Sequence, residues 1–71
     1  MRIRYTKHAL DRFYDRSIGK TDVKNAIMHG QMSNASGGML ARAYKKGGRT
    51  LIVKYVIKGV GDVEIITAYW Q

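Results

Sequence analysis

Residues 49–70 of this chain read RTLIVKYVIKGVGDVEIITAYW. Two runs rich in β-branched and aromatic residues, 49–58 and 63–70, flank the tetrapeptide GVGD, whose glycines favour a turn. Two such runs joined by a short glycine-containing turn predict an antiparallel hairpin. A third strand is predicted at residues 39–45, joined to the hairpin across a Gly-Gly turn. The carboxyl-terminal half is therefore predicted to be an antiparallel meander.

Strand alternation divides the side chains of this meander between two faces. We expect Val53 to lie opposite Ala68, and Tyr55 opposite Ile66, across the second turn. The face predicted to be buried under helices carries Leu51, Val53, Tyr55, Ile57, Ile66, Ala68 and Trp70. The other face is predicted to form a groove lined by Ile52, Lys54, Val56, Lys58, Val63, Ile65, Thr67 and Tyr69.

The length of the Gly-Gly turn decides which way the third strand faces. A three-residue turn places Leu40, Arg42 and Tyr44 in the groove and Met39, Ala41 and Ala43 in the core. A two-residue turn reverses the two sets and buries Arg42. We expect the three-residue turn, because arginine is rarely found in a core.

The amino-terminal segment predicts a short strand followed by a helix. Ile3 to Tyr5 form the strand, and Thr6 stands where the N-cap of a helix is expected. The following segment KHALDRFYDR, residues 7–16, gathers its apolar side chains on one side of a helix. This pattern leaves His8 and Arg12 on the outer side of that helix.

A second helix is predicted from about Asp22, after a glycine that interrupts the first helical pattern. Thr21 is expected to be its N-cap, and the acidic side chain of Asp22 suits the positive end of the helix dipole. The helix is expected to end with His29 in its last turn and Gly30 in a left-handed conformation. Residues 31–38 are rich in Ser, Asn and Gly and predict a surface loop.

Together these elements predict an α+β fold, in which two amino-terminal helices pack on a curved antiparallel β-meander of three to four strands. A chain of 71 residues has room for a single domain, which covers residues 1–71. Hydrophobic residues make up 45% of the chain, which favours a folded protein over a disordered one. Because cysteine is absent, the predicted fold depends on its hydrophobic core.

Positive charge dominates the composition. Thirteen Lys and Arg residues against five Asp and Glu residues give a formal net charge of +8 at pH 7. We expect RNA as the partner, because phosphates that are neutralised by basic side chains release their counterions. No membrane partner is expected, because no basic amphipathic helix with bulky apolar anchors accompanies the charge. The absence of a long apolar run predicts a cytoplasmic protein.

His8, Arg12 and Arg16 are the first candidate group for catalysis. They follow one another at i, i+4 and i+8 along one side of the first predicted helix. Cleavage of RNA without a metal needs a base that takes the 2′-hydroxyl proton, a cation that stabilises charge building on the phosphorane, and an acid that protonates the leaving 5′-oxygen. Histidine transfers protons near neutral pH, and arginine binds phosphate bidentately. Alternatively, His8 lies at the surface, and both arginines are solvated or paired with Asp11 and Asp15.

The predicted groove supplies the second candidate group, which consists of Thr67, Tyr69, Lys54 and Arg42. Hydroxyl groups and cations on one sheet face suit a phosphate, and an aromatic ring there can stack on a base. The residues expected to hold RNA are Lys45, Lys46, Arg49 and Lys54, with Tyr44 as a stacking partner. The same residue types are also common in solvated strands and hairpin tips.

No metal and no cofactor are expected for this chain. Its five carboxylates are scattered, its two histidines are far apart in the sequence, and no glycine-rich phosphate loop opens a helix. His29 is interpreted as a helix-end residue outside the catalytic site, because its position already suits the helix dipole.

Two segments of the sequence form a recognisable pattern, KHALDR at residues 7–12 and IITAYW at residues 65–70. Between them lie Arg16-Ser17-Ile18, Val23, Ile27 and Gly30. In these positions, and over nearly its whole length, the chain resembles the domain of unknown function family 4258. The resemblance implies membership of the barnase, EndoU, colicin and RelE-like superfamily. In that superfamily, amino-terminal helices pack on a four-stranded antiparallel sheet, and most members are metal-independent RNases that act as toxins.

The resemblance also implies a set of site residues. The family's functional positions fall on His8, Arg12 and Arg16 in the first helix, on Thr67 and Tyr69 in the last strand, and on Arg42 or Lys45 in the middle strand. Ser17 departs from the family pattern, because a glycine is common at that position.

The sequence therefore predicts a metal-independent endoribonuclease that cleaves RNA by attack of the 2′-hydroxyl. The resemblance implies a toxin with an antitoxin or immunity protein as its partner. Two alternatives remain open: a module that binds RNA without cutting it, and a toxin that acts by protein contact. The nuclease hypothesis depends on His8 and Thr67 converging on one cationic hollow.

Overall fold

The computed structural model describes residues 1–33 and 35–71. Asn34, which belongs to the predicted surface loop, lies outside the described residues. The elements are β1 (Arg2–Tyr5), α1 (Lys7–Asp15), α2 (Lys20–His29), β2 (Gln31–Ser33), β3 (Leu40–Lys46), β4 (Arg49–Gly59) and β5 (Asp62–Trp70). The predicted α+β class, with two helices before a β-rich half, is confirmed.

The five strands form one mixed sheet in the order β1-β5-β4-β3-β2. Strands β2 to β5 pair antiparallel along the chain, as expected for a meander, and β1 pairs parallel with β5. The prediction of three to four strands is therefore too low. The unexpected strand is β2, which lies within the segment 31–38 that was predicted to be a loop. It pairs with residues 41–43 of β3. Three residues are too few to show a period-2 pattern in the sequence.

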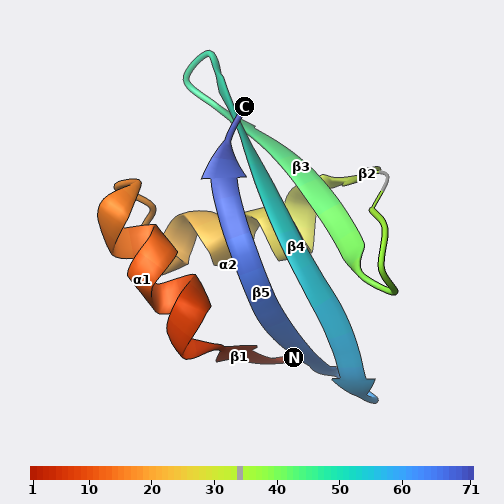
Figure 1. The fold of residues 1–71 in the computed structure, drawn as a ribbon. Helices are drawn as coiled ribbons and strands as arrows, with labels where there is room; N and C mark the ends of the chain where they lie inside the picture. The colour runs from red at the N-terminus through yellow and green to blue at the C-terminus, as the bar shows by residue number, and fades with distance from the viewer. Residues whose placement is uncertain (34) are drawn as a thin grey trace.

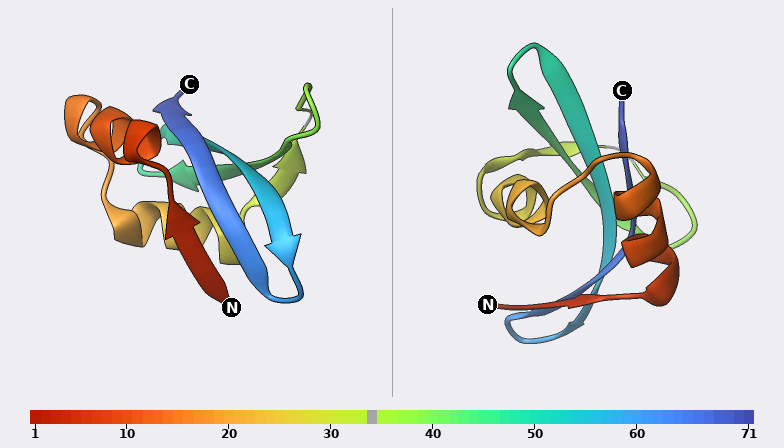
Figure 2. Two further views of the ribbon diagram at one scale, coloured as in Figure 1. Left: turned by 60° about the horizontal axis from the view of Figure 1, so that its bottom comes forward. Right: turned by 90° about the vertical axis from the view of Figure 1, so that its left-hand side faces the viewer.

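The two helices take different positions around the sheet. Helix α2 crosses one face of the sheet, behind β3, β4 and β5 in the view of Figure 1. Helix α1 follows β1 and runs beside the upper half of β5, where β1 no longer pairs with it. In the right-hand view of Figure 2, α2 lies on one side of the sheet and α1 lies toward the other side. In the described ranges 1–33 and 35–71, no helix is long and apolar enough to cross a bilayer.

The hydrophobic core lies between the sheet and the helices. It is formed by Ala9 and Phe13 of α1, Ile18 before α2, Val23, Ala26 and Ile27 of α2, Leu51, Val53 and Tyr55 of β4, and Val63, Ile65 and Ala68 of β5. Tyr5 of β1 packs edge-on against Phe13, with ring centroids 5.8 Å apart, and its burial raises the pKa of its hydroxyl. Each well-buried large side chain contributes about 1.5–3 kcal/mol to stability.

Capping residues decide where both helices begin. The Oγ1 atom of Thr6 accepts a hydrogen bond from the Ala9 N–H at 3.0 Å, so the predicted cap of α1 is confirmed. Helix α2 begins at Lys20, two residues earlier than predicted, because Gly19 is its N-cap and not Thr21. The Asp22 carboxylate accepts a hydrogen bond from the Gly19 N–H at 3.3 Å and so closes the first turn.

Gly30 ends α2 for a different reason from the one predicted. Its φ of −73° is not left-handed, so the expected C-cap conformation is wrong. A Cβ atom on this residue would lie 2.5 Å from the carbonyl oxygen of Ala26 and 2.9 Å from that of Ala43. Glycine is required here because the chain passes very close to β3.

The turn between β3 and β4 contains two residues, because Lys46 pairs directly with Arg49. Gly47 and Gly48 have φ angles of 56° and 83°, a combination that suits a tight hairpin turn. The expected three-residue turn is therefore wrong, and the two faces of β3 are exchanged. Leu40, Arg42 and Tyr44 share the face of the core residues Val53 and Leu51, while Ala41 and Ala43 face away from α2.

A bulge at Ile66 changes the register between β4 and β5. Val53 pairs with Ala68 as predicted, but Tyr55 pairs with Ile65 and leaves Ile66 as the extra residue. Beyond the bulge, Val63 and Ile65 therefore point into the core, although they were predicted to line the groove. Ile57 was predicted to be buried, but 63% of it is exposed near the end of the hairpin.

Candidate nucleic-acid interface

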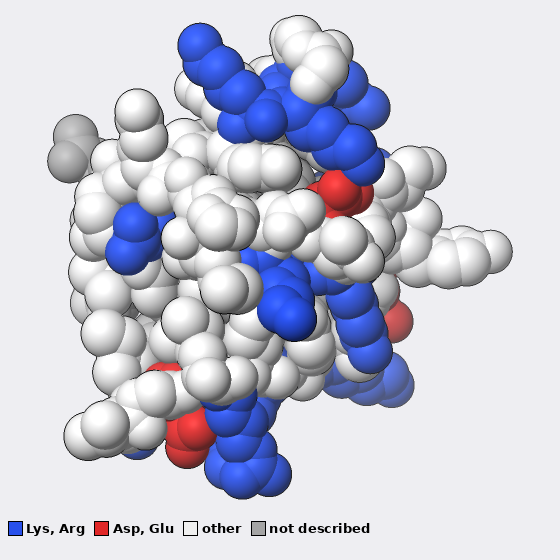
Figure 3. All heavy atoms as spheres, turned by 180° about the vertical axis from the view of Figure 1, so that it is seen from behind, with Lys and Arg blue, Asp and Glu red and all other residues white. Residues whose placement is uncertain are grey.

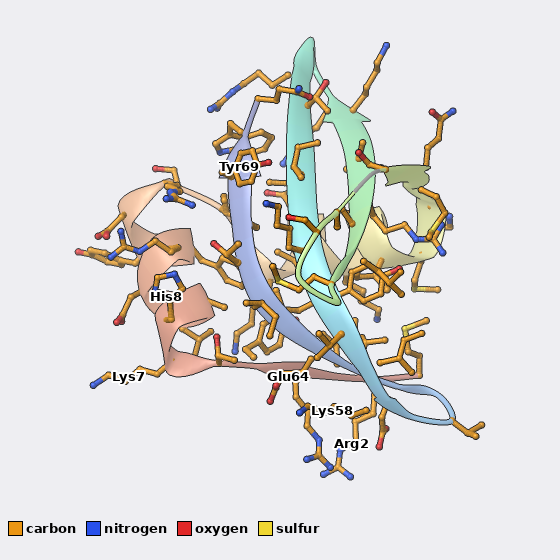
Figure 4. All side chains as sticks on the ribbon, turned by 45° about the vertical axis from the view of Figure 1, so that its right-hand side comes forward. Arg2, Lys7, His8, Lys58, Glu64 and Tyr69 are labelled. Atoms are coloured by element: carbon orange, nitrogen blue, oxygen red, sulfur yellow. The ribbon has the colours of Figure 1, made fainter. Side chains whose placement is uncertain are left out.

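The side of the sheet that faces away from α2 is called the open face below. Alternation along the strands places on it Ala43 and Lys45 of β3, Thr50, Ile52 and Lys54 of β4, and Thr67 and Tyr69 of β5. Figure 4 views the molecule from this side. It shows Tyr69 on β5 and, lower in the view, His8 on the neighbouring helix α1.

Lys54, Thr67 and Tyr69 form one patch on the open face. Lys54 lies directly opposite Thr67 in the register, and its Nζ atom is 5.7 Å from the centre of the Tyr69 ring. All three side chains are partly exposed. An ammonium, a hydroxyl and an aromatic ring at this spacing can contact a phosphate, a ribose and a base of one nucleic-acid strand.

Arg42 does not belong to this patch. Its Nη1 donates a hydrogen bond to the carbonyl oxygen of Gly30 at 3.0 Å, and its Nε donates to the hydroxyl of the buried Tyr55 at 3.2 Å. The side chain therefore joins the end of α2 to the sheet, and its predicted position in the groove is wrong. Tyr44 is on the same side and packs against the core, so its predicted position in the groove is also wrong.

His8 and Arg12 lie on the helix that borders the open face. His8 is exposed in the first turn of α1, on the side from which Figure 4 is seen. Arg12 pairs with Asp15 through Nη2 at 3.3 Å, while its Nε is buried and has no hydrogen-bond partner among the described residues. Because this Nε is buried, an incoming acceptor can reach it only if the Arg12 side chain moves. The convergence of His8 with Thr67 remains a prediction.

Arg16 connects the end of α1 to β5. Its Nη1 donates to the carbonyl oxygen of Ala68 at 2.7 Å, and its own carbonyl oxygen accepts a hydrogen bond from Nε1 of Trp70 at 2.9 Å. These two contacts join residues more than 50 positions apart. Part of the guanidinium is thus used to hold α1 beside the sheet.

The β3–β4 hairpin carries three basic residues in different environments. Lys45 is exposed on the open face. Lys46 lies on the opposite side, where its Nζ donates to Oδ1 of Asp22 at 2.7 Å, and the guanidinium of Arg49 lies 4.1 Å from the centre of the Trp70 ring. The hydrogen bond from Lys46 lowers the pKa of Asp22; burial acts in the opposite direction, and the Gly19 N–H adds to the lowering. Of these three residues, Lys45 is the one presented on the open face.

The positive charge is not confined to the open face. Figure 3 shows the opposite side of the molecule, where Lys and Arg side chains stand in several separate groups with uncharged surface between them. On the open side, Lys58 pairs with Glu64 at 3.6 Å, and Figure 4 shows both near Arg2 at the end of the sheet opposite Tyr69. Net charge alone therefore does not identify the binding surface. Across the described ranges, no three His, Asp or Glu side chains form a group that could hold a metal ion.

An open pocket of about 350 Å³ lies at the outer edge of β3. It is lined by His29, Gln31, Ala43, Tyr44, Lys45 and Thr50. Sequence reasoning missed this pocket because it did not predict β2, which brings Gln31 next to Ala43. His29 was assigned to the helix end alone.

The model of one protein family matches residues 5–70, which covers nearly all of these elements. The chain belongs to the domain of unknown function family DUF4258. The matched range includes every candidate residue of α1, β3, β4 and β5 described above. No curated protein and no solved structure matches the chain. Membership of DUF4258 is thus shown, and the function of the site has to be argued from its chemistry.

Proposed function

We propose that this DUF4258 domain is an endoribonuclease that binds single-stranded RNA on its open face and cleaves it without a metal. The observation that carries the proposal is the patch of Lys54, Thr67 and Tyr69 beside α1, which presents His8 and Arg12. The net charge of +8 supports a polyanionic partner, and the open face is the one broad surface of the sheet that α2 does not cover.

The proposed reaction is a transesterification within the RNA chain. The 2′-oxygen attacks the neighbouring phosphorus and loses its proton, while the bond from phosphorus to the 5′-oxygen breaks and that oxygen gains a proton. The products are a 2′,3′-cyclic phosphate and a 5′-hydroxyl. His8 transfers protons, and Arg12 and Lys54 stabilise the charge on the phosphate oxygens. Thr67 donates a hydrogen bond to a phosphate oxygen, and Tyr69 stacks on a base.

The proposal also assigns the domain to the barnase, EndoU, colicin and RelE-like superfamily, as a toxin neutralised by an antitoxin or immunity protein. The order of elements supports this assignment, because the two helices precede an antiparallel meander, as the resemblance implies. A partner that neutralises the toxin would have to cover the patch of Lys54, Thr67 and Tyr69. An acidic partner surface would suit the charge of this chain.

The proposed activity is tested by incubating RNA with the protein in EDTA and analysing the ends of the products. We expect fragments with 2′,3′-cyclic phosphate ends. His8→Ala should slow cleavage by about 10²- to 10⁴-fold, the usual contribution of a general acid or base. Tyr14→Ala is the matched control, because Tyr14 is on the same helix and 89% exposed. Cleavage that EDTA abolishes, or equal rates for the two variants, would contradict the mechanism.

A second candidate function is RNA binding without cleavage. It is favoured by the exposure of His8, because a histidine in open solvent is not held in one orientation for proton transfer. In this case the protein binds RNA in a salt-dependent manner, the binding survives His8→Ala, and no cyclic phosphate forms. A toxin that acts by protein contact would instead show little affinity for RNA.

A further inference from the structure

The pocket at the edge of β3 has features that the proposed cleavage site does not use. Strand β2 pairs only with residues 41–43 of β3, so the outer edge of β3 from Tyr44 onward has no paired strand among the described residues. The pocket of about 350 Å³ lies at this step in the sheet, between the end of α2 and the β3–β4 hairpin. Pockets that bind small ligands begin at about this size.

The backbone N–H and C=O groups of Lys45 point toward this outer edge of β3. The tight turn makes Lys46 and Arg49 a hydrogen-bonded pair, so the peptide groups of Lys46 point toward β4. Alternation then directs the N–H and C=O groups of Lys45 and Ala43 to the outer side. The position of Gly30 agrees with this, because its Cβ would lie 2.9 Å from the carbonyl oxygen of Ala43. Ala43 has β2 as its partner strand. Lys45 lies beyond the end of β2, so its N–H and C=O groups on this side have no strand partner in the part of the chain that the structure describes.

Two of the other lining residues, Gln31 and Thr50, supply further donors and acceptors. The carboxamide of Gln31 supplies both, and the hydroxyl of Thr50, the cross-strand partner of Lys45, supplies either. Ala43 contributes a small apolar surface between them. A flat ring with adjacent donors and acceptors along its edge matches such a lining, and nucleobases have this chemistry.

The pocket lies at the sheet edge, and part of its lining belongs to the open face that carries the proposed cleavage site. Gln31, Ala43, Lys45 and Thr50 are on the open face, whereas Tyr44 and His29 line the pocket from the side of α2. The register aligns Gln31, Ala43, Ile52 and Tyr69 in one row across β2, β3, β4 and β5. Ala43 and Tyr69 are two strand spacings apart, roughly 10 Å. One RNA strand on the open face can therefore contact Tyr69 and reach the side of the pocket that Gln31 and Ala43 line.

We infer that the pocket binds one nucleobase of the RNA strand held on the open face and so gives the proposed nuclease a sequence preference. This inference rests on the proposed function. Gln31 and the backbone of Lys45 read the edge of the base, Thr50 adds a third polar contact, and the Lys45 ammonium binds an adjacent phosphate. A bidentate contact between a protein and the edge of a base discriminates between bases by about 5- to 150-fold.

The test uses isotope-labelled protein and follows backbone amide signals by NMR. The four nucleoside 5′-monophosphates and inorganic phosphate are titrated separately. We expect the amide signals of Gln31, Lys45 and Thr50 to shift with at least one nucleotide, with affinities that differ between bases, and not with phosphate alone. Gln31→Met and Thr50→Val should each weaken this binding at least fivefold, while Thr21→Val, at an exposed threonine of α2, should not.

Each contrary outcome has a distinct meaning. Equal shifts with all four nucleotides and with inorganic phosphate would overturn the inference, because they indicate a simple anion site. RNA cleavage without any shift at the pocket would also overturn it and would leave the proposed nuclease intact. Base-selective binding in the pocket without RNA cleavage would support the nucleobase site, but it would overturn the nuclease and with it the preference in cleavage.

Discussion

Replacing Arg42 with methionine should destabilise the domain without weakening RNA binding. Methionine has a similar aliphatic stem but cannot donate to the Gly30 carbonyl or the Tyr55 hydroxyl, which the guanidinium contacts at 3.0 and 3.2 Å. A hydrogen bond from a charged group contributes about 1.5–3 kcal/mol, and partial exposure lets water replace some of it. We therefore expect the free energy of unfolding to fall by about 2 kcal/mol.

Urea unfolding followed by tryptophan fluorescence measures this loss, because Trp70 is the single tryptophan and packs against the core. In a domain of this size, a loss of 2 kcal/mol also lowers the thermal midpoint by roughly 8–16 °C. Lys45→Met is the matched control, since Lys45 is exposed on the open face of the same strand. Its effect on stability should stay within about 0.5 kcal/mol.

RNA affinity of the folded variants separates the two faces of β3. Arg42→Met should bind RNA as the wild type does, whereas Lys45→Met should bind it more weakly. An Arg42→Met variant that keeps its stability but loses RNA affinity would contradict this prediction, because it would place Arg42 on the binding surface.

Three further substitutions test local features of the fold. Asp22→Asn should cost about 1–2 kcal/mol at pH 7. The hydrogen bond from Lys46 lowers the pKa of Asp22 in the folded state. The stability that the Asp22 carboxylate gives the fold is therefore complete above its unfolded pKa of about 3.9 and is lost as the pH falls through its folded pKa. Urea unfolding between pH 7 and pH 2 should therefore show a smaller acid-induced loss in the variant than in the wild type. Ser17→Gly should raise the free energy of unfolding by about 0.5–1 kcal/mol, because the φ of Ser17 is +54°, a conformation that only glycine adopts without steric cost. A lower thermal midpoint for this variant would count against the prediction. Gly30→Ala should cost about 2–3 kcal/mol, since its Cβ would lie 2.5 Å from a backbone oxygen, and calorimetry that finds an unchanged midpoint would disprove the close approach.

The central hairpin was predictable because its pattern is regular. Val53 lies opposite Ala68, and both are buried, as alternation along two long strands indicates. The bulge at Ile66 was not predictable, because Ile65 and Ile66 are identical in polarity and a shift of one residue between them leaves no mark in the sequence. The helix cap at Thr6 was predictable, since its signal is local.

The error at Arg42 has a different physical origin. The cost of burying arginine led to the expectation of a three-residue turn, although a Gly-Gly pair favours the tighter turn that is found. That cost is offset by the Gly30 carbonyl and the Tyr55 hydroxyl, which are distant in sequence and meet only in the folded state. Lys54, Thr67 and Tyr69 could be grouped in advance, because they lie on two paired strands. The pocket beside Gln31 could not, because β2 has no periodic signal.

The salt dependence of RNA binding shows whether RNA lies on the open face. Lys54→Met removes an ammonium from the open face, and Lys24→Met removes one from the exposed surface of α2. For a single-stranded RNA, loss of one phosphate contact should reduce the slope of log affinity against log salt by about 0.7. We predict this reduction for Lys54→Met and an unchanged slope for Lys24→Met; the reverse result would contradict the assignment of RNA to the open face.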